Sequence, residues 1–164
     1  MADLRWKAYG TAGLVLLLDR LTKWIIETRV SFVDSYRVIP GFFEIVHSQN
    51  RGVAFGVFND STSEWRSILL VVGSLVAVAV ISAMLWKPGK LDRKTMWGCA
   101  LILGGAAGNL VDRLLFGQVT DFLLFHVGDY QWPTFNVADS AIVIGSGLLL
   151  LDLLRPRRQA ANVS

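Results

Sequence analysis

The residues best suited to chemistry in this chain are acids that lie within or beside apolar segments. Asp121 and Asp139 are separated by a short interval, and Asp19 and Asp112 stand in apolar surroundings earlier in the chain. Two carboxyls close enough to share a proton acquire separated pKa values, so that one acts as a general base while the other donates a proton. Such a pair can hydrolyse a peptide bond with a water molecule and no covalent intermediate.

Other catalytic groups are weaker candidates. Cys99 lies away from His47 and His126, and we predict it to be a packed small residue. The chain has no HExxH motif, two isolated histidines do not make a zinc site, and no serine is arranged with a lysine or histidine base. We therefore expect no metal site and no cofactor.

Each polar residue also has a structural interpretation. Asp19 and Lys23 are four residues apart, which favours an ion pair within one helix. Asn109, Asp112 and Arg113 can share one helix face, and they would then form either a polar helix end or part of a site.

The two remaining acids have structural alternatives as well. Asp139 could cap the helix that follows it, a role that Asp fills well. Asp121 could be an ordinary acid in a short loop between two helices. Gly104 and Gly108 are four residues apart, and this spacing predicts close helix packing rather than a ligand loop.

Membrane helices must position these acids, because the composition is that of a membrane protein. Apolar residues make up 53% of the 164 residues, charged residues 18%, and the mean hydropathy is +0.48. Such a composition excludes disorder, and a single cysteine excludes a disulfide scaffold. The net charge of +3 would suit a nucleic-acid partner only if the basic residues were placed to meet one.

We predict an all-α membrane protein with one domain, 1–164, and four transmembrane helices. Ser67–Trp86 carries no charge and, at about 1.5 Å per residue, spans about 30 Å. The first helix is predicted to be a retained span, because charged residues and no small-residue cleavage site follow its apolar part. The predicted spans are about 8–26, 67–86, 95–113 and 135–154.

The basic residues predict that both termini are cytoplasmic, because they concentrate before the first span, between the second and third, and after the fourth. These residues are Arg5, Lys7, Lys87, Lys90, Arg93, Lys94, Arg155, Arg157 and Arg158. The positive charge then faces anionic lipid, which argues against nucleic acid. The polar helix ends and Asp121 gather at the extracytoplasmic face, where water is available.

The 27–66 segment is predicted to form a small extracytoplasmic β-rich cradle. Two β-rich runs, 36–39 and 42–49, flank a turn at Pro40-Gly41. Residues 59–66 are predicted to be a short surface helix or the start of the second span. The phenylalanines expected at the membrane interface are Phe42, Phe43, Phe55 and Phe58.

Five motifs occur in order along nearly the whole chain. They are Asp19-Arg-Leu-Thr-Lys23, Asn50-Arg-Gly-Val-Ala-Phe55, Gly104-Gly-Ala-Ala-Gly-Asn-Leu-Val-Asp-Arg113, Val119-Thr-Asp-Phe122 and Phe135-Asn-Val-Ala-Asp139. This set resembles the motifs of the bacterial lipoprotein signal peptidases, the signal peptidase II family. The resemblance implies an aspartic endopeptidase of the bacterial cytoplasmic membrane. It would remove signal peptides from prolipoproteins, N-terminal to a diacylglyceryl-modified cysteine, and would be inhibited by globomycin.

The resemblance also implies roles for individual residues. It assigns catalysis to Asp121 and Asp139, and Thr120 matches a variable position. Positions that bind substrate or support the site are Asn50, Gly52, Asn109, Arg113, Asn136 and Ala138. Motif positions with a structural role are Asp19, Lys23 and Asp112. The implied partners are a prolipoprotein, membrane lipids and globomycin-type inhibitors, without nucleic acid.

Two other functions remain open. A small transporter or channel subunit could use Asp19, Asp112 and Asp139 as a proton or cation path. Against this, Asp152 is the only acid in the cytoplasmic half of a predicted span, so no relay crosses the membrane. A purely structural subunit is the second alternative, and it predicts that neutralising single acids leaves function intact.

Overall fold

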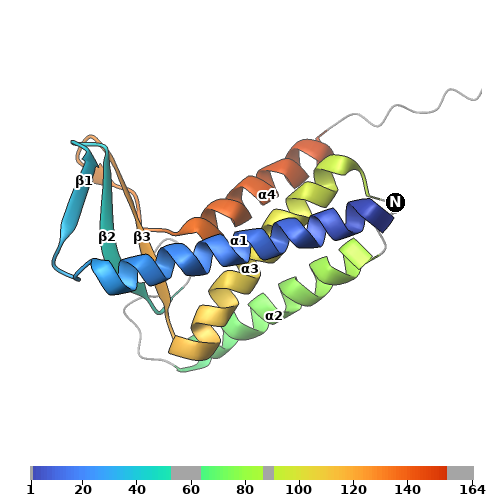
Figure 1. Ribbon diagram of the computed structural model, residues 1–164, viewed down its shortest axis with the longest axis horizontal. Helices are drawn as coiled ribbons and strands as arrows, with labels where there is room; N and C mark the ends of the chain where they lie inside the picture. The colour runs from blue at the N-terminus through green and yellow to red at the C-terminus, as the bar shows by residue number, and fades with distance from the viewer. Residues whose placement is uncertain (1, 53–63, 87–90, 155–164) are drawn as a thin grey trace, which may run out of the picture.

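The computed structural model describes residues 2–52, 64–86 and 91–154, which form helices and one small antiparallel sheet (Figure 1). The helices are α1 (Ala2–Arg29), α2 (Glu64–Trp86), α3 (Arg93–Phe116) and α4 (Val137–Leu153). The strands are β1 (Ser35–Ile39), β2 (Phe43–Asn50), β3 (Val119–Val127) and β4 (Tyr130–Gln131). The four predicted helices are thus confirmed as helices, with ends shifted by a few residues.

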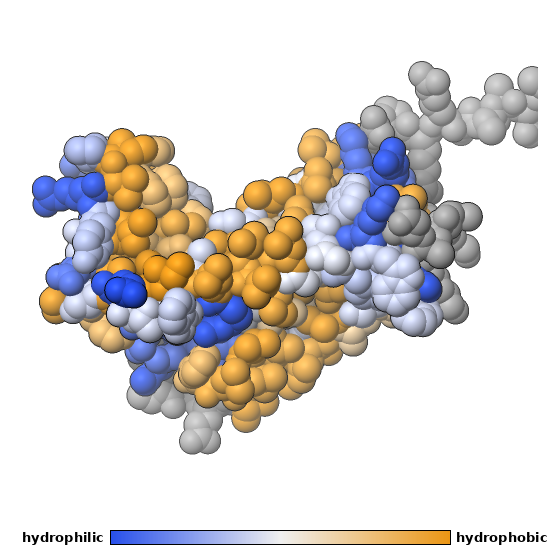
Figure 2. Space-filling model, viewed as in Figure 1, coloured by the Kyte–Doolittle hydropathy of each residue, from blue (hydrophilic) through white to orange (hydrophobic). Residues whose placement is uncertain are grey.

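Two of the described helices are long and apolar enough to cross a membrane, over Ile68–Trp86 in α2 and Arg93–Phe116 in α3. Only 6% of the apolar window of α2 is buried, against 56% for α3. Most of α2 therefore presents apolar side chains outward, as Figure 2 shows along the lower edge of the molecule. A helix with this exposure needs an apolar surrounding. Four spans remain a prediction, since α1 carries several charges and α4 has 17 residues.

Helix α3 packs against the other three helices, and its glycines make that possible. A Cβ at Gly104 would lie 2.5 Å from the Ala12 carbonyl oxygen of α1, and one at Gly105 would overlap the Ala138 carbonyl oxygen of α4. A Cβ at Gly108 would lie 2.6 Å from Oδ2 of Asp19. The predicted close packing is confirmed, and it brings the polar residues of α1 and α4 directly against α3.

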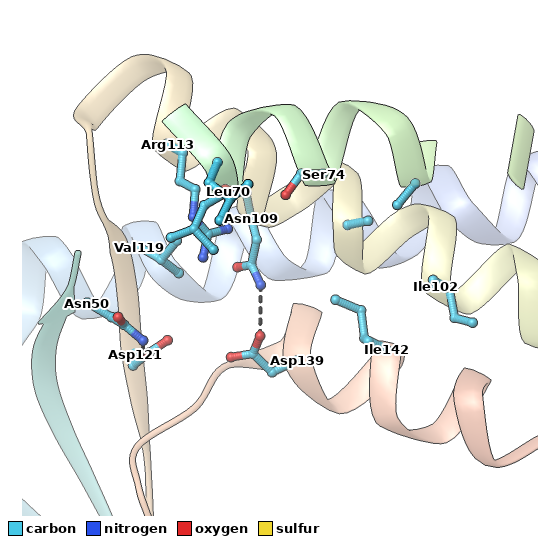
Figure 3. Close-up of a pocket in the computed structure, with 14 residues that line it drawn as sticks. Asn50, Leu70, Ser74, Ile102, Asn109, Arg113, Val119, Asp121, Asp139 and Ile142 are labelled. Atoms are coloured by element: carbon cyan, nitrogen blue, oxygen red, sulfur yellow. Dashed lines mark hydrogen bonds between the residues drawn. The ribbon is translucent and has the colours of Figure 1, made fainter. Parts of the chain in front are cut away.

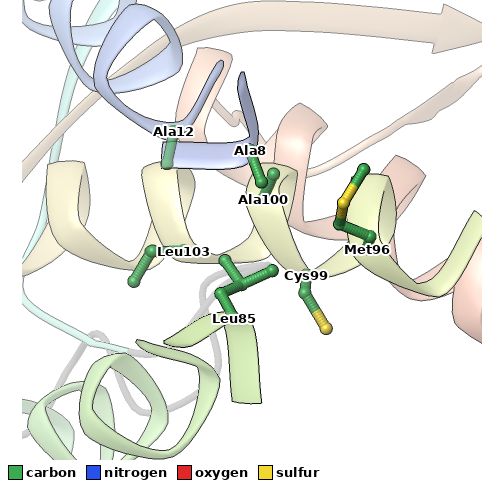
Figure 4. Packing of buried hydrophobic residues seen from close by; sticks show 7 residues of the cluster. All are labelled: Ala8, Ala12, Leu85, Met96, Cys99, Ala100 and Leu103. Carbon is green, nitrogen blue, oxygen red and sulfur yellow. The ribbon is translucent and has the colours of Figure 1, made fainter. Parts of the chain in front are cut away.

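The apolar core lies where the start of α1, the end of α2 and the first half of α3 meet, away from the sheet (Figure 1), and its side chains are shown in Figure 4. Small residues of α1 and α3 interlock there with Leu85 of α2, which is fully buried. Cys99 belongs to this cluster and is 1% exposed, so its prediction as a packed small residue is confirmed. The full set is Ala8, Ala12, Leu85, Met96, Cys99, Ala100 and Leu103.

The sheet has the strand order β1-β2-β3-β4, with neighbouring strands antiparallel. Its first hairpin confirms the β-rich prediction for 36–49. The prediction that Asp121 lies in a loop is wrong, because β3 runs through it and pairs Asp121 with Ser48 of β2. The β3 sequence is rich in β-branched and aromatic residues, which suit a strand that pairs with the free edge of β2.

The sheet sits at the end of the bundle where α1 and α3 end and where α4 begins (Figure 1). Gly117 ends α3 in a left-handed conformation, with φ of 70°, and its N–H donates to the Arg113 carbonyl. This cap turns the chain sharply into β3. Of the predicted interface residues, Phe42 is exposed and Phe43 is half-buried. Phe55, Phe58 and residues 59–63 lie outside the described residues.

Candidate active site

Asp121 and Asp139, here called the carboxyl pair, face one cavity at the junction of the sheet and the helices (Figure 3). Asp121 comes from β3 and Asp139 from the first turn of α4. The cavity has a volume of about 320 Å³ and is lined by residues of β2, β3, α2, α3 and α4. We call it the main cavity. The two acids predicted to act together are therefore brought to one place.

Amide groups of three asparagines hold the carboxyl pair. Asp121 Oδ1 accepts from Asn136 Nδ2 at 2.7 Å, and its Oδ2 accepts from Asn50 Nδ2 at 2.9 Å. Asp139 Oδ1 accepts from Asn109 Nδ2 at 2.8 Å, and its Oδ2 accepts from the backbone N–H of Asn136 at 3.3 Å. Every carboxyl oxygen of the pair thus has a neutral amide donor.

Asn136 binds both members of the pair and also begins α4. Its backbone is extended, with φ of −132°, and its side-chain oxygen accepts from the backbone N–H of Asp139 at 2.9 Å. Asn136 is therefore the cap of the helix, while Asp139 stands three residues later and completes a capping box. The alternative in which Asp139 is the cap is wrong, because Asp139 already has helical backbone geometry.

Behind the carboxyl pair lies a buried ion cluster of Asp19, Arg20, Lys23 and Asp112. Lys23 Nζ is 2.7 Å from Asp19 Oδ2 and 2.6 Å from Asp112 Oδ2, and the Lys23 side chain is fully buried. Arg20 Nη1 donates to Asp112 Oδ1 at 2.5 Å. The predicted ion pair between Asp19 and Lys23 is confirmed, and Asp112 of α3 joins it.

The ion cluster contacts the carboxyl pair through Asn109 and Ala138. Lys23 Nζ donates to Asn109 Oδ1 at 2.9 Å, so the amide group of Asn109 points toward Asp139. Asp19 Oδ1 accepts from the backbone N–H of Ala138 at 2.9 Å, which fixes the start of α4. Gly108 leaves room for the Asp19 carboxyl. The cluster therefore sets the position and orientation of the groups around Asp139.

Arg113 and Gly52 connect the end of α3 to the chain after β2. Arg113 donates to the carbonyl oxygens of Asn109 and Gly52, each at 3.3 Å. The backbone N–H of Gly52 donates to Asn50 Oδ1 at 2.8 Å, which leaves Asn50 Nδ2 directed at Asp121. Both residues, predicted to support the site, thus contact it through Asn50 and Asn109.

Burial raises the pKa of Asp121 from 3.8 to about 7, and the negative charge of nearby Asp139 adds to the effect. The hydrogen bonds from Asn50 and Asn136 act in the opposite direction, because they stabilise the ionised form. At neutral pH the Asp121 carboxyl is therefore protonated in a large fraction of molecules. This is the state that a proton donor needs.

Sequence reasoning missed a second set of contacts that steadies β3. Thr120 Oγ1 donates to Glu27 Oε1 at 2.7 Å, and Glu27 lies 3.7 Å from Arg20 of the ion cluster. Thr120 precedes Asp121, so this chain fixes the strand beside the carboxyl pair. Positions 20, 23 and 27 lie on one face of a helix by their spacing, so the sequence could have predicted that Arg20 and Glu27 lie beside Lys23. No local signal indicates their contact with Thr120.

Comparison with solved structures defines the class of protein first. Two structures described as bacterial membrane enzymes superpose on this chain with TM-scores of 0.84 and 0.78, at 28% and 29% identity. The first alignment covers 96% of this chain and 94% of the other, and the second covers 92% and 94%. The fold is that of a bacterial membrane enzyme.

Comparison with sequences narrows the class to a family. A family model described as signal peptidase (SPase) II matches residues 11–155. The lipoprotein signal peptidase of Solibacter usitatus is 68% identical over all of both chains, and that of Nitratidesulfovibrio vulgaris is 41% identical over 94% of each. The chain belongs to the signal peptidase II family and is a hydrolase of peptide bonds.

Proposed function

We propose that this chain is an aspartic endopeptidase that cleaves the signal peptide from diacylglyceryl-modified prolipoproteins, just before the modified cysteine. The observation that carries the mechanism is that Asp121 and Asp139 line one cavity and are both bound by Asn136. Family membership supports the substrate, because the relatives are lipoprotein signal peptidases.

We assign the two roles from the charge between the acids, because the negative charge of Asp139 opposes ionisation of Asp121. Asp139 is the base: it removes a proton from a water molecule, whose oxygen attacks the scissile carbonyl carbon. Asp121 is the acid: with a pKa of about 7 it holds a proton and donates it to the carbonyl oxygen. When the tetrahedral intermediate collapses, the C–N bond breaks and Asp139 passes its proton to the leaving nitrogen. One hydroxyl of the intermediate returns its proton to Asp121, which restores the starting state of the pair. No metal or covalent intermediate enters this cycle.

The remaining motif residues position the reacting groups. Asn50 and Asn136 hold Asp121, and Asn109 holds Asp139. Gly52 and Arg113 fix Asn50 and the end of α3, while Ala138 binds Asp19 through its backbone. The residues with a structural role in this proposal are Asp19, Lys23 and Asp112.

The proposed topology is one domain, 1–164, with four transmembrane helices, cytoplasmic termini and the carboxyl pair near the extracytoplasmic face. The apolar exterior of α2 and the position of the sheet at one end of the bundle support it. A reporter fused after Ser164 should be cytoplasmic, and one inserted at Asp60 should be extracytoplasmic. The reverse labelling would contradict this topology.

The proposed activity is tested with purified protein and a synthetic diacylated prolipoprotein peptide. We expect one cut before the modified cysteine, inhibition by globomycin, and no effect of chelators or thiol reagents. Loss of cleavage with a chelator and recovery with zinc would refute the aspartic mechanism. A proton or cation path would need acids along the helices. On α4, no described acid lies between Asp139 and Asp152, and Asp152 accepts a hydrogen bond from Thr95 Oγ1 at 2.7 Å. A transporter is therefore disfavoured.

A further inference from the structure

A second cavity lies on the other side of Asp139 from the main cavity. It has a volume of about 310 Å³, and Asp139 is the only charged residue among the described residues that line it. We call it the α4 pocket. Of the described residues, only Asp139 lines both cavities. The residues of the α4 pocket are Trp132, Phe135, Asp139, Ser140, Val143 and Ile144.

The walls of the two cavities differ in chemistry. The main cavity contains Asn50, Asn109 and Arg113 near the carboxyl pair, which can bind the carbonyls and amides of a peptide. The α4 pocket has two aromatic rings and two aliphatic side chains, and its Ser140 hydroxyl already donates to the Asn136 carbonyl at 2.9 Å. The α4 pocket therefore suits hydrocarbon better than a peptide backbone.

The apolar wall of the main cavity includes small residues from two helices, Gly73 and Ala77 of α2 and Ala106 of α3. Small side chains let another helix backbone approach closely. The main cavity thus offers a groove for an apolar helix that leads to polar groups beside the carboxyl pair.

The α4 pocket opens to the outside of the bundle. Val143 and Ile144 are 57% and 59% exposed on α4. The space between α4 and the sheet is a hollow with apolar walls (Figure 2). An apolar chain can therefore enter sideways from surrounding lipid along the apolar sides of this hollow.

We propose that the α4 pocket binds an acyl chain of the diacylglyceryl cysteine while the main cavity binds the signal-peptide helix. This inference rests on the proposed function. Its basis is that the substrate has two apolar parts joined at the scissile bond, and that two apolar cavities meet at one proposed catalytic residue. A bond held at Asp139 has the signal peptide on one side and the lipidated cysteine on the other.

The test uses two peptide substrates with the same signal sequence, one carrying two palmitoyl chains and one carrying two butyryl chains. Val143→Trp fills the α4 pocket, and Ile144→Trp is the second variant in case the first folds poorly. Each variant should raise the ratio of KM for the long-chain substrate to KM for the short-chain substrate about tenfold. This is the effect expected when roughly two methylene groups of the long acyl chain are no longer buried.

Two matched variants separate the pockets. Ala77→Leu narrows the main cavity and should raise KM for both substrates by a similar factor. Leu150→Trp lies on α4 outside both cavities, is exposed, and should leave the ratio unchanged. Thermal unfolding in detergent reports the folding of each variant.

The outcomes distinguish this inference from the proposed function. A wild-type protein that cleaves both substrates with equal KM, or a Val143→Trp variant that leaves the ratio unchanged, would overturn the α4 pocket alone. A wild-type protein that cleaves neither substrate would overturn both proposals. A tenfold change in the ratio for Val143→Trp, absent in Ala77→Leu, supports the acyl-chain assignment.

Discussion

The ion cluster and the carboxyl pair each bury two aspartates, but they differ in the charge of the groups that bind those aspartates. In the ion cluster, Asp19 and Asp112 are matched by Lys23 and Arg20 at 2.5 to 2.7 Å. In the carboxyl pair, the hydrogen bonds that Asp121 and Asp139 accept from described residues come from amide groups. Asn109 contacts both regions, with its oxygen toward Lys23 and its NH2 toward Asp139.

The difference shows how buried acids of one type acquire different roles. A carboxylate paired with a buried cation stays ionised and holds structure, because protonation would leave the cation unmatched. Among the described residues no cation lies within ion-pair distance of Asp121 or Asp139, and Lys23 and Arg113 act on them from farther away, so a proton can supply part of the balance. Burial alone therefore does not distinguish the proposed catalytic acids from the acids of the ion cluster, whereas the charge of their hydrogen-bond partners does.

The largest expected effect comes from removing the ionisable protons of the carboxyl pair. Asp121→Asn and Asp139→Asn should each lower kcat by about 10²–10⁴-fold, and the double variant by little more, because the two groups act as a unit. Asp112→Asn should lose less, since Asp112 belongs to the ion cluster. Near-normal cleavage by folded Asp121→Asn or Asp139→Asn would refute the mechanism.

The next effect comes from breaking the charge balance of the ion cluster. Lys23→Met leaves Asp19 without its cation and should cost about 3–5 kcal/mol of unfolding free energy. Asp19→Asn added to Lys23→Met should recover part of that loss, because the buried charge is gone and Asn can still accept from Ala138. Thermal unfolding in detergent measures both variants. Equal stability of wild type and Lys23→Met would contradict the role given to the ion cluster.

A smaller effect concerns pH and stability. The pKa of Asp121 is about 7 in the folded chain, against 3.8 for an ordinary aspartate. The contribution of this group to the free energy of unfolding is therefore complete below about pH 4 and is lost as the pH rises through 7. Asp121→Asn removes this dependence. Its Tm relative to wild type should therefore rise between pH 4 and pH 8, whatever constant offset the amide introduces. A constant Tm difference over that range would argue against the raised pKa.

The smallest effect is a shift in the pH profile of cleavage. The hydrogen bond from Asn50 lowers the pKa of Asp121, so Asn50→Leu should raise that pKa further. Because Asp121 must be protonated to donate, the alkaline limb of kcat should move to higher pH. The comparison is a full pH–rate profile of wild type and Asn50→Leu. An alkaline limb that stays in place while the acid limb moves to higher pH would show that Asp121 acts as the base.

The sequence permits prediction of contacts within an element better than contacts between distant elements. The Asp19–Lys23 pair follows from spacing of one helical turn, and the glycine contacts of α3 follow from Gly104 and Gly108. The strand at Asp121 does not follow from local spacing, because β3 depends on pairing with β2, which lies two helices earlier. For the same reason the sequence does not predict the hydrogen bond between Thr120 and Glu27, which are 93 positions apart.

The double role of Asn136 has a consequence for biosynthesis. Asn136 binds both members of the carboxyl pair only when it caps α4, and α4 is the last of the described helices to be synthesised. A nascent chain that ends before α4 still lacks Asp139 and Asn136, which is one of the two residues that hold Asp121. The proposed catalytic centre can therefore be complete only after the chain has been synthesised through the start of α4.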